Sequence, residues 1–162
     1  MKTVFALSFA LGSLAVAGCA AVPSRSGIGP QRTEACVLTN EQTISALFDR
    51  WNGSLQTGDP HKVAANYAKR SVLLATVSNK PRLTVEEKED YFEHFLENRP
   101  VGHIDFRMIE IGCTTAVDSG LYTFTFGKTG DIVKARYTYT YQWDGQEWLI
   151  TSHHSSAMPE KQ

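Results

Sequence analysis

Apolar residues recur at helical spacing in the first part of the chain. Between residues 40 and 55 they follow a period of about 3.6 residues, which is typical of one buried helix face; the positions are Ile44, Leu47, Phe48, Trp51 and Leu55. Thr39 or Asn40 is placed to cap this helix, and Gly58 ends it. A short helix is predicted after Asp59, because a proline occupies its first helical position.

A third helix and a run of strands complete the pattern. Thr84 and Glu87 have capping-box spacing, and the helix predicted from them to residue 99 carries on one side Tyr91, Phe92, Phe95 and Leu96. One strand precedes this helix and four follow it; the segments are residues 71–77, 103–112, 119–127, 133–143 and 147–154. Two of them, residues 119–127 and 133–143, are rich in Tyr, Phe and Thr, as strands prefer. Asp144 and Gly145 mark a hairpin. This order predicts an α+β fold, in which a curved antiparallel sheet wraps a long helix and forms an open cone.

Composition and charge favour one globular domain. The chain has 162 residues, of which 42% are hydrophobic and 20% charged, and its formal net charge is -1. This length is enough to bury one sizeable core. A nucleic-acid-binding protein usually carries a basic patch or run, and this sequence has no such run. We therefore expect no nucleic-acid partner.

The N-terminus has the pattern of an export signal. Residues 1–18 open with one Lys and continue with apolar and small residues, which predicts a signal peptide. Val16-Ala17-Gly18-Cys19 resembles the lipobox of bacterial lipoproteins, whose Cys is lipidated and holds the protein to a membrane. The expected location is the periplasmic face of an outer membrane, with Cys19 as the anchor. The alternative is a soluble periplasmic or secreted protein cleaved near Ala20.

Residues 19–38 are rich in Pro, Gly and Ser, which predicts a flexible tether before the folded domain of residues 39–162. Cys36 and Cys113 are the two cysteines that remain. In an oxidising compartment such a pair suggests a disulfide. The alternative is two buried free thiols.

The hairpins place candidate polar residues in one row. A two- or three-residue turn in the last hairpin would bring Arg136 opposite His153 or His154. The preceding hairpin would bring Tyr122 opposite Arg136. A one-residue slip in either hairpin would break this row.

We expect this row to form the polar floor of a cavity that binds a small polar or acidic ligand. A buried Arg needs an anion or carboxylate partner, and the third helix would supply an apolar wall. The predicted ligand-binding residues are Tyr91, Phe95, Tyr122, Arg136, His153 and His154. The alternative is that Arg136 forms a structural ion pair, for example with Asp105 or Glu110.

The tandem histidines do not predict a metal site. Neighbouring side chains on a strand point to opposite faces of the sheet, so His153 and His154 cannot easily share an ion. Zinc needs three or four convergent ligands. We expect neither a metal nor a cofactor.

The opposite face of the same strands predicts self-association. Tyr137, Tyr139 and Tyr141 alternate along one strand, and the neighbouring residues that extend their face in this interpretation are Leu121, Thr123 and Thr125. No predicted helix is left to cover this aromatic face, which favours a homodimer or higher oligomer.

Five separated motifs together resemble one bacterial family. They are "ATVSNKPR" (75–82), "DYFEHFL" (90–96), "GLYTFTF" (120–126), "ARYTYTY" (135–141) and "HHSSAMPE" (153–160). They resemble proteins named for similarity to the calcium/calmodulin-dependent protein kinase II association domain, also called the SgcJ/EcaC type, within the nuclear transport factor 2-like superfamily. The resemblance spans residues 40–160 and implies the cone fold and pairing through the sheet. The sequence shows no kinase domain and no calmodulin-binding helix, so no kinase activity is expected.

Three functions fit these observations. The working hypothesis is a binding module: an exported, lipid-anchored dimer whose cone holds a small ligand. The first alternative is an enzyme of the isomerase, dehydratase or cyclase type, in which His153 or His154 acts as the general base and Arg136 stabilises an oxyanion. The second alternative is a purely structural domain.

Overall fold

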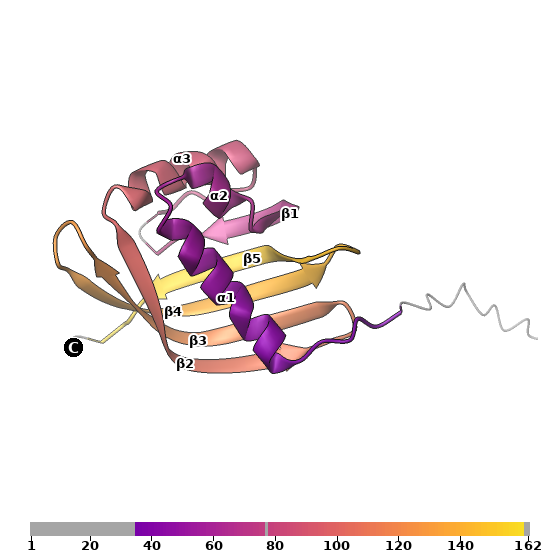
Figure 1. The fold of residues 1–162 in the computed structure, drawn as a ribbon. Coiled ribbons are helices and arrows are strands. Elements are labelled where there is room, and N and C mark those ends of the chain that lie inside the picture. Colours follow the sequence, from indigo (N-terminus) through magenta and orange to yellow (C-terminus); the bar gives the residue numbers. More distant parts are fainter. Residues whose placement is uncertain (1–34, 77, 161–162) are drawn as a thin grey trace, which may run out of the picture. The chain divides into compact units, whose positions relative to one another are not determined.

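Three helices and a five-stranded sheet make up the part of the chain that the structure describes (Figure 1). The structure is a computed structural model, and it describes residues 35–76 and 78–160. In chain order the elements are α1 (Glu41–Leu55), α2 (Pro60–Ala64), β1 (Tyr67–Leu74), α3 (Val85–Leu96), β2 (Pro100–Ile111), β3 (Thr115–Phe126), β4 (Ile132–Trp143) and β5 (Trp148–Ala157). The predicted signal peptide, the predicted lipidation site at Cys19 and most of the predicted tether lie outside the described residues.

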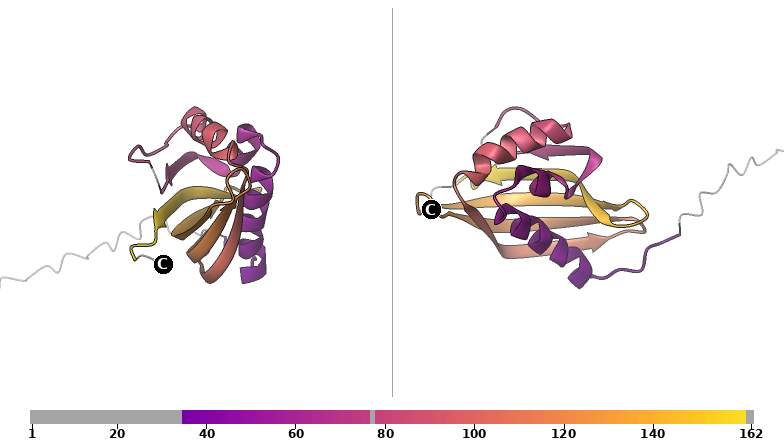
Figure 2. Two further views of the ribbon diagram at one scale, coloured as in Figure 1. Left: turned by 90° about the vertical axis from the view of Figure 1, so that its left-hand side faces the viewer. Right: turned by 45° about the horizontal axis from the view of Figure 1, so that its top comes forward.

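The sheet has the strand order β1-β5-β4-β3-β2. Strands β2 to β5 pair antiparallel with their chain neighbours, whereas β1 pairs parallel with β5. The predicted α+β fold is confirmed, with the difference that the sheet is mixed. Helix α1 crosses one face of the curved sheet, and α2 and α3 lie near β1 (Figures 1 and 2).

The helix starts follow from local side-chain hydrogen bonds. The Asn40 side chain accepts a hydrogen bond of 2.9 Å from the backbone N–H of Thr43, so Asn40 is the cap of α1. Thr84 and Glu87 form the predicted capping box at the start of α3. Gly58 follows α1 with a φ of 67°, a left-handed conformation that glycine adopts without strain.

Helix α1 is fixed to β2 at one glycine. The side-chain amide of Asn52 accepts a hydrogen bond from the N–H of Gly102 (2.8 Å) and donates one to its carbonyl oxygen (2.9 Å). A Cβ at Gly102 would lie 3.1 Å from the rings of Phe48 and Phe124, which is closer than an ordinary contact, so one of these groups would have to shift. The sequence of β2 therefore permits the close approach that brings α1 over the sheet.

A disulfide between Cys36 and Cys113 joins the segment before α1 to the β2–β3 connection. The backbone N–H of Val37 adds a hydrogen bond of 3.0 Å to the carbonyl oxygen of Cys113. The first described residues of the chain are thus attached to the sheet before α1 begins.

The prediction that Tyr137, Tyr139 and Tyr141 form an exposed dimer face is wrong. Their exposed fractions are 3%, 0% and 0%, because they lie on the inner face of the sheet, beneath α1. An aromatic helix face needs an aromatic sheet face to pack against, and Trp51 makes an edge-to-face contact of 5.8 Å with Tyr139. Since β3 alternates in the same way, the outer face carries instead Leu121, Thr123 and Thr125.

The predicted row of Tyr122, Arg136 and a histidine is also wrong. Tyr122 pairs with Ala135, one residue away from the predicted partner, and Arg136 pairs with Ser156. The last hairpin has a four-residue connection, and a register shift between Thr140 and Tyr141 moves the pairing by one more residue.

Candidate ligand-binding cavity

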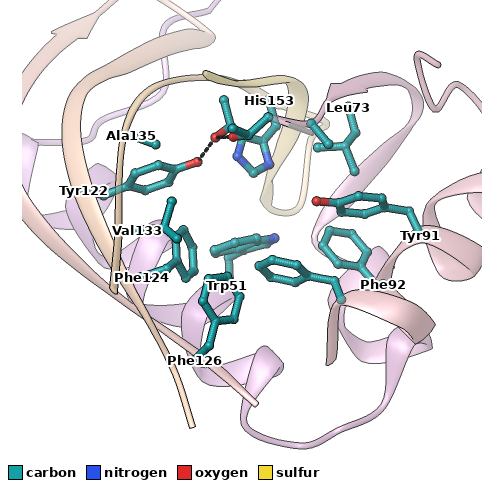
Figure 3. Close-up of a pocket in the computed structure, with 14 residues that line it drawn as sticks. Trp51, Leu73, Tyr91, Phe92, Tyr122, Phe124, Phe126, Val133, Ala135 and His153 are labelled. Carbon is teal, nitrogen blue, oxygen red and sulfur yellow. Dashed lines mark hydrogen bonds between the residues drawn. The ribbon is translucent and has the colours of Figure 1, made fainter. Parts of the chain in front are cut away.

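A cavity of about 210 Å³ lies between the inner face of the sheet and helices α1 and α3 (Figure 3). Helix α1 contributes Trp51 and helix α3 contributes Tyr91, while strands β3 to β5 form the other side. Most of the lining is apolar, and its largest apolar side chains are Trp51, Leu73, Phe92, Phe95, Phe124 and Phe126.

Alternation along β3 builds one aromatic wall. Tyr122, Phe124 and Phe126 are two residues apart, so their rings share the inner face. Phe124 meets the ring of Phe95 edge to face at 5.8 Å and that of Trp51 at 6.2 Å. These contacts join β3 to α3 and α1, and they leave the cavity lined by ring faces and edges.

His153 is a buried polar side chain of the cavity, with an exposed fraction of 4%. It pairs with Tyr139 in the sheet, and its ring stacks on the Tyr139 ring with centroids 4.1 Å apart. The Tyr67 hydroxyl and Nδ1 of His153 share a hydrogen bond of 2.8 Å, whereas Nε2 is buried without a partner among the described residues. Burial, with a smaller contribution from His154, lowers the pKa of His153 from 6.5 to about 3. The imidazole is therefore neutral at physiological pH.

A row of hydroxyl groups lies beside His153. The Tyr122 hydroxyl donates a hydrogen bond of 2.5 Å to Oγ of Ser155, and Thr76 shares a further hydrogen bond with Ser155. Tyr91 projects from α3 with its hydroxyl directed toward the space between these groups and Trp51 (Figure 3). Burial raises the pKa of Tyr91 to about 12, so this hydroxyl is also neutral.

Four of the predicted ligand-binding residues line the cavity, and two do not. Tyr91, Phe95, Tyr122 and His153 are brought together as lining residues. Arg136 and His154 are exposed on the outer face of the sheet, because the register differs from the predicted one. Arg136 does not form the alternative structural ion pair with Asp105 or Glu110 either; it donates a hydrogen bond of 3.5 Å to the carbonyl oxygen of Ala157.

The arginine that reaches the inner face is the half-buried Arg107, not Arg136. Its guanidinium lies 3.1 Å from the Asp118 carboxylate, which also accepts a hydrogen bond of 2.8 Å from the Tyr137 hydroxyl. Burial raises the pKa of Asp118, while Tyr137 and Arg107 oppose that change. This cluster does not line the cavity. Asp105, a predicted candidate carboxylate, bonds instead to Thr123 and His103.

Charged groups are absent from the described residues that line the cavity. These residues include no Arg, Lys, Asp or Glu. Within the described ranges, no three His, Cys, Asp or Glu side chains are grouped so that they could hold a metal ion. The polar side-chain groups of the lining residues are therefore hydroxyls, one neutral imidazole and the indole N–H of Trp51, which is buried without a hydrogen-bond partner among the described residues.

The sequence prediction missed Trp51, Thr76 and Ser155 as cavity residues. Ser155 follows His153 by two positions, so strand alternation could have placed it on the same face. Trp51 was predicted as core, which it also is, at 2% exposure. Nothing in the local sequence around Thr76 indicates that it reaches Ser155, since 79 residues separate them.

No helix in residues 35–76 and 78–160 is long and apolar enough to span a membrane. This finding concerns the described helices alone.

Comparison with known proteins shows relatives of the same fold. Residues 40–159 match the family described as the calcium/calmodulin dependent protein kinase II association domain. A Xanthomonas campestris protein described in the same terms is 46% identical, with 78% of this chain and 96% of that chain covered and a TM-score of 0.73. No curated protein matches the chain.

Two more distant structures share the fold alone. A nuclear transport factor 2-like protein of unknown function from Pseudomonas putida is 18% identical, with 75% and 89% of the two chains covered and a TM-score of 0.65. A nuclear transport factor 2-like superfamily protein from Salmonella enterica serovar Typhimurium is 13% identical, with 75% and 92% covered and a TM-score of 0.59.

Proposed function

Because the chain belongs to the calcium/calmodulin-dependent protein kinase II association domain family, we propose that it is a non-catalytic binding domain. In this proposal the inner-face cavity holds a small molecule, and the outer face joins two copies of the chain. The observation that carries the proposal is the cavity of about 210 Å³, into which α1, α3 and the sheet all direct side chains.

The lining favours a mainly apolar ligand over an acidic one. An acidic ligand was expected because Arg136 was predicted in the cavity, and Arg136 lies on the outer face. A carboxylate in an apolar cavity without a cation would lose its hydration with little compensation. Aromatic walls with a few neutral polar groups are typical of small-molecule sites.

The geometry does not favour the enzyme hypothesis. A general base works best when its pKa lies near the working pH, and burial lowers the pKa of His153 to about 3. His154 and Arg136, the other two residues of that hypothesis, are exposed on the opposite face of the sheet. The cavity thus has the groups to bind and orient a molecule and lacks the proposed base and oxyanion donor.

A residue at the rim of the cavity allows a direct test of binding. Val133 lines the cavity and is 39% exposed, so Val133→Trp should block the entrance without disturbing the core. Small molecules that stay bound through purification would be released and identified by mass spectrometry. We expect compounds enriched with the wild type and with the control Ile132→Trp, and lost with Val133→Trp. The same compounds in equal amounts from all three proteins would contradict the proposal.

We further propose that the protein is exported and anchored by a lipid at Cys19. The lipobox-like Val16-Ala17-Gly18-Cys19 motivates this, and the disulfide between Cys36 and Cys113 supports an oxidising compartment. Mass spectrometry of protein extracted from membranes should find an acylated N-terminal Cys19, and Cys19→Ser should move the protein to the soluble fraction. Unchanged localisation of Cys19→Ser would contradict lipid anchoring.

A further inference from the structure

The polar groups of the cavity allow the class of ligand to be named. We infer that the cavity takes an uncharged, flat compound of one or two rings that presents a carbonyl oxygen to the polar wall of Tyr91 and His153. This inference rests on the proposed function, because it concerns the same cavity.

The size of the cavity limits the ligand to a small ring compound. An engineered apolar cavity of about 150 Å³ in another protein binds benzene. The cavity here is about 210 Å³, which leaves room for one ring with a substituent or for two compact rings. A larger or branched molecule would have to displace the aromatic walls.

The shape and chemistry of the walls favour a flat ligand. Phe95, Phe124 and Trp51 contact one another edge to face, so both ring faces and ring edges border the space. An aromatic ligand can continue this pattern, in which the electron-poor edge of one ring meets the electron-rich face of the next. A flexible aliphatic chain would gain less from these walls and would lose more conformational freedom.

The absence of charge in the described lining residues excludes an ionised ligand. The Arg82 guanidinium packs over the Tyr91 ring at 5.7 Å and does not line the cavity. An ionised carboxylate or amine would therefore be buried without a counter-ion, which is costly.

The tautomer of His153 decides what the polar wall offers. The Tyr67 hydroxyl and Nδ1 of His153 lie 2.8 Å apart. Because a phenol is a strong hydrogen-bond donor and the bare nitrogen of a neutral imidazole is a strong acceptor, we assign the hydroxyl as the donor. The single hydrogen of the neutral ring then lies on Nε2, which has no partner among the described residues. A buried N–H without a partner costs free energy that a ligand oxygen could recover.

Tyr91 supplies a second donor toward the same space. Its hydroxyl points into the cavity across from His153 (Figure 3). The Tyr122 hydroxyl, in contrast, already donates to Ser155. A carbonyl oxygen has two lone pairs and no hydrogen, so it matches two donors, whereas a hydrocarbon leaves both unsatisfied.

Three flat probes of nearly equal size separate these properties. Acetophenone carries a carbonyl oxygen, α-methylstyrene replaces that oxygen with a CH₂ group, and benzoate carries a charge. Their binding to the full chain would be measured by ligand-observed NMR titration. We expect acetophenone to bind about 10-fold more tightly than α-methylstyrene, because one or two neutral hydrogen bonds contribute about that much to affinity. Benzoate should bind more weakly than either.

Isosteric variants assign the effect to the wall. Tyr91→Phe keeps the ring and removes the hydroxyl, so it should weaken acetophenone binding about 3- to 10-fold and leave α-methylstyrene unchanged. Tyr141→Phe is the matched control, because its hydroxyl is also buried and does not line the cavity. Val133→Trp should abolish binding of both uncharged probes.

The outcomes distinguish failure of this inference from failure of the proposed function. Equal affinity for acetophenone and α-methylstyrene, or tightest binding of benzoate, would overturn the ligand class while the cavity remained a binding site. Binding of none of the probes, or binding that Val133→Trp leaves unchanged, would overturn both.

Discussion

Burial of a single imidazole sets the chemistry of the cavity at the residue scale. His153 is 4% exposed, lies against the Tyr139 and Trp51 rings, and shares its hydrogen bond with a neutral phenol, Tyr67. Among the described residues, the hydrogen-bond and ring partners of His153 include no carboxylate that could stabilise the imidazolium. The ring is therefore a neutral hydrogen-bonding group and a poor base.

This burial predicts a pH dependence of stability. The pKa of His153 falls from 6.5 to about 3 on folding, so between these values the unfolded chain binds a proton that the folded chain does not. The free energy of unfolding should thus decrease as the pH falls below 6.5. At pH 5 this one group accounts for about 2 kcal/mol, from 1.36 kcal/mol per pH unit.

Denaturant unfolding at pH 7 and pH 5 tests this. His153→Phe should reduce the loss of stability between the two pH values by about 2 kcal/mol. The exposed neighbour variant, His154→Phe, should show the loss of the wild type. An equal loss in wild type and His153→Phe would mean that His153 is not buried in the neutral form.

Alternation along the strand could predict that one of the two histidines faces inward, and the structure agrees. It could not predict which one, because either face of β4 could be the buried one: one face carries three tyrosines, and the other carries Arg136 and threonines. The choice depends on α1, whose aromatic face packs on the tyrosines. That long-range contact is not visible in the sequence of the strand.

At the scale of the elements, the β4–β5 hairpin decides which side chains meet. The Asp144 carboxylate accepts hydrogen bonds from the N–H groups of Gln146 (2.8 Å) and Glu147 (2.9 Å), which stabilises a four-residue connection. Together with the shift near Thr140, this connection moves every pair of the hairpin relative to a two-residue turn. The periodicity of the sequence predicted the helices and strands well, but register depends on such turn contacts. The predicted row of Tyr122, Arg136 and a histidine is wrong for that reason.

The Cys36–Cys113 disulfide should contribute to stability at this scale. It closes a loop with a sequence separation of 77 residues and ties the start of α1 to the sheet. Loop-closure entropy predicts that Cys36→Ser/Cys113→Ser loses about 2–4 kcal/mol in the free energy of unfolding. Urea unfolding with and without reductant provides the measurement.

Cys19→Ser is the matched control, since it removes a thiol without touching this disulfide, and it should unfold like the wild type. In the unreduced, unfolded wild type, neither Cys36 nor Cys113 should react with a thiol label. Labelling of both would show that the bond does not form.

At the scale of the described domain, the two faces of the sheet have different roles. The inner face packs on the helices and forms the cavity, while the outer face carries exposed apolar side chains on β2. Phe106 and Met108 are 58% and 57% exposed, and Phe106 pairs with Leu121 on this same face. A patch of this kind favours an interface, and we propose that a second copy of the chain covers it.

Introduction of negative charge on the outer face tests the dimer. The oligomeric state of the full chain carrying Cys19→Ser would be measured by sedimentation equilibrium at a protein concentration of tens of micromolar, an order of concentration suited to a modest interface. We expect a dimer. Phe106→Glu with Met108→Glu should raise the dissociation constant at least about 30-fold, as loss of a central interface contact would. Leu83→Glu, at a site of matched 57% exposure on the α3 side, should leave the dimer intact. A wild type that is monomeric under these conditions would contradict the proposal.

The most direct test of the central claim is an experimental structure of the protein with acetophenone soaked into the crystals. The account predicts that the probe lies among Trp51, Phe95 and Phe124, with its carbonyl oxygen within hydrogen-bonding distance of the Tyr91 hydroxyl or Nε2 of His153. A cavity closed by inward movement of these rings, or a probe bound only on the outer face of the sheet, would contradict it.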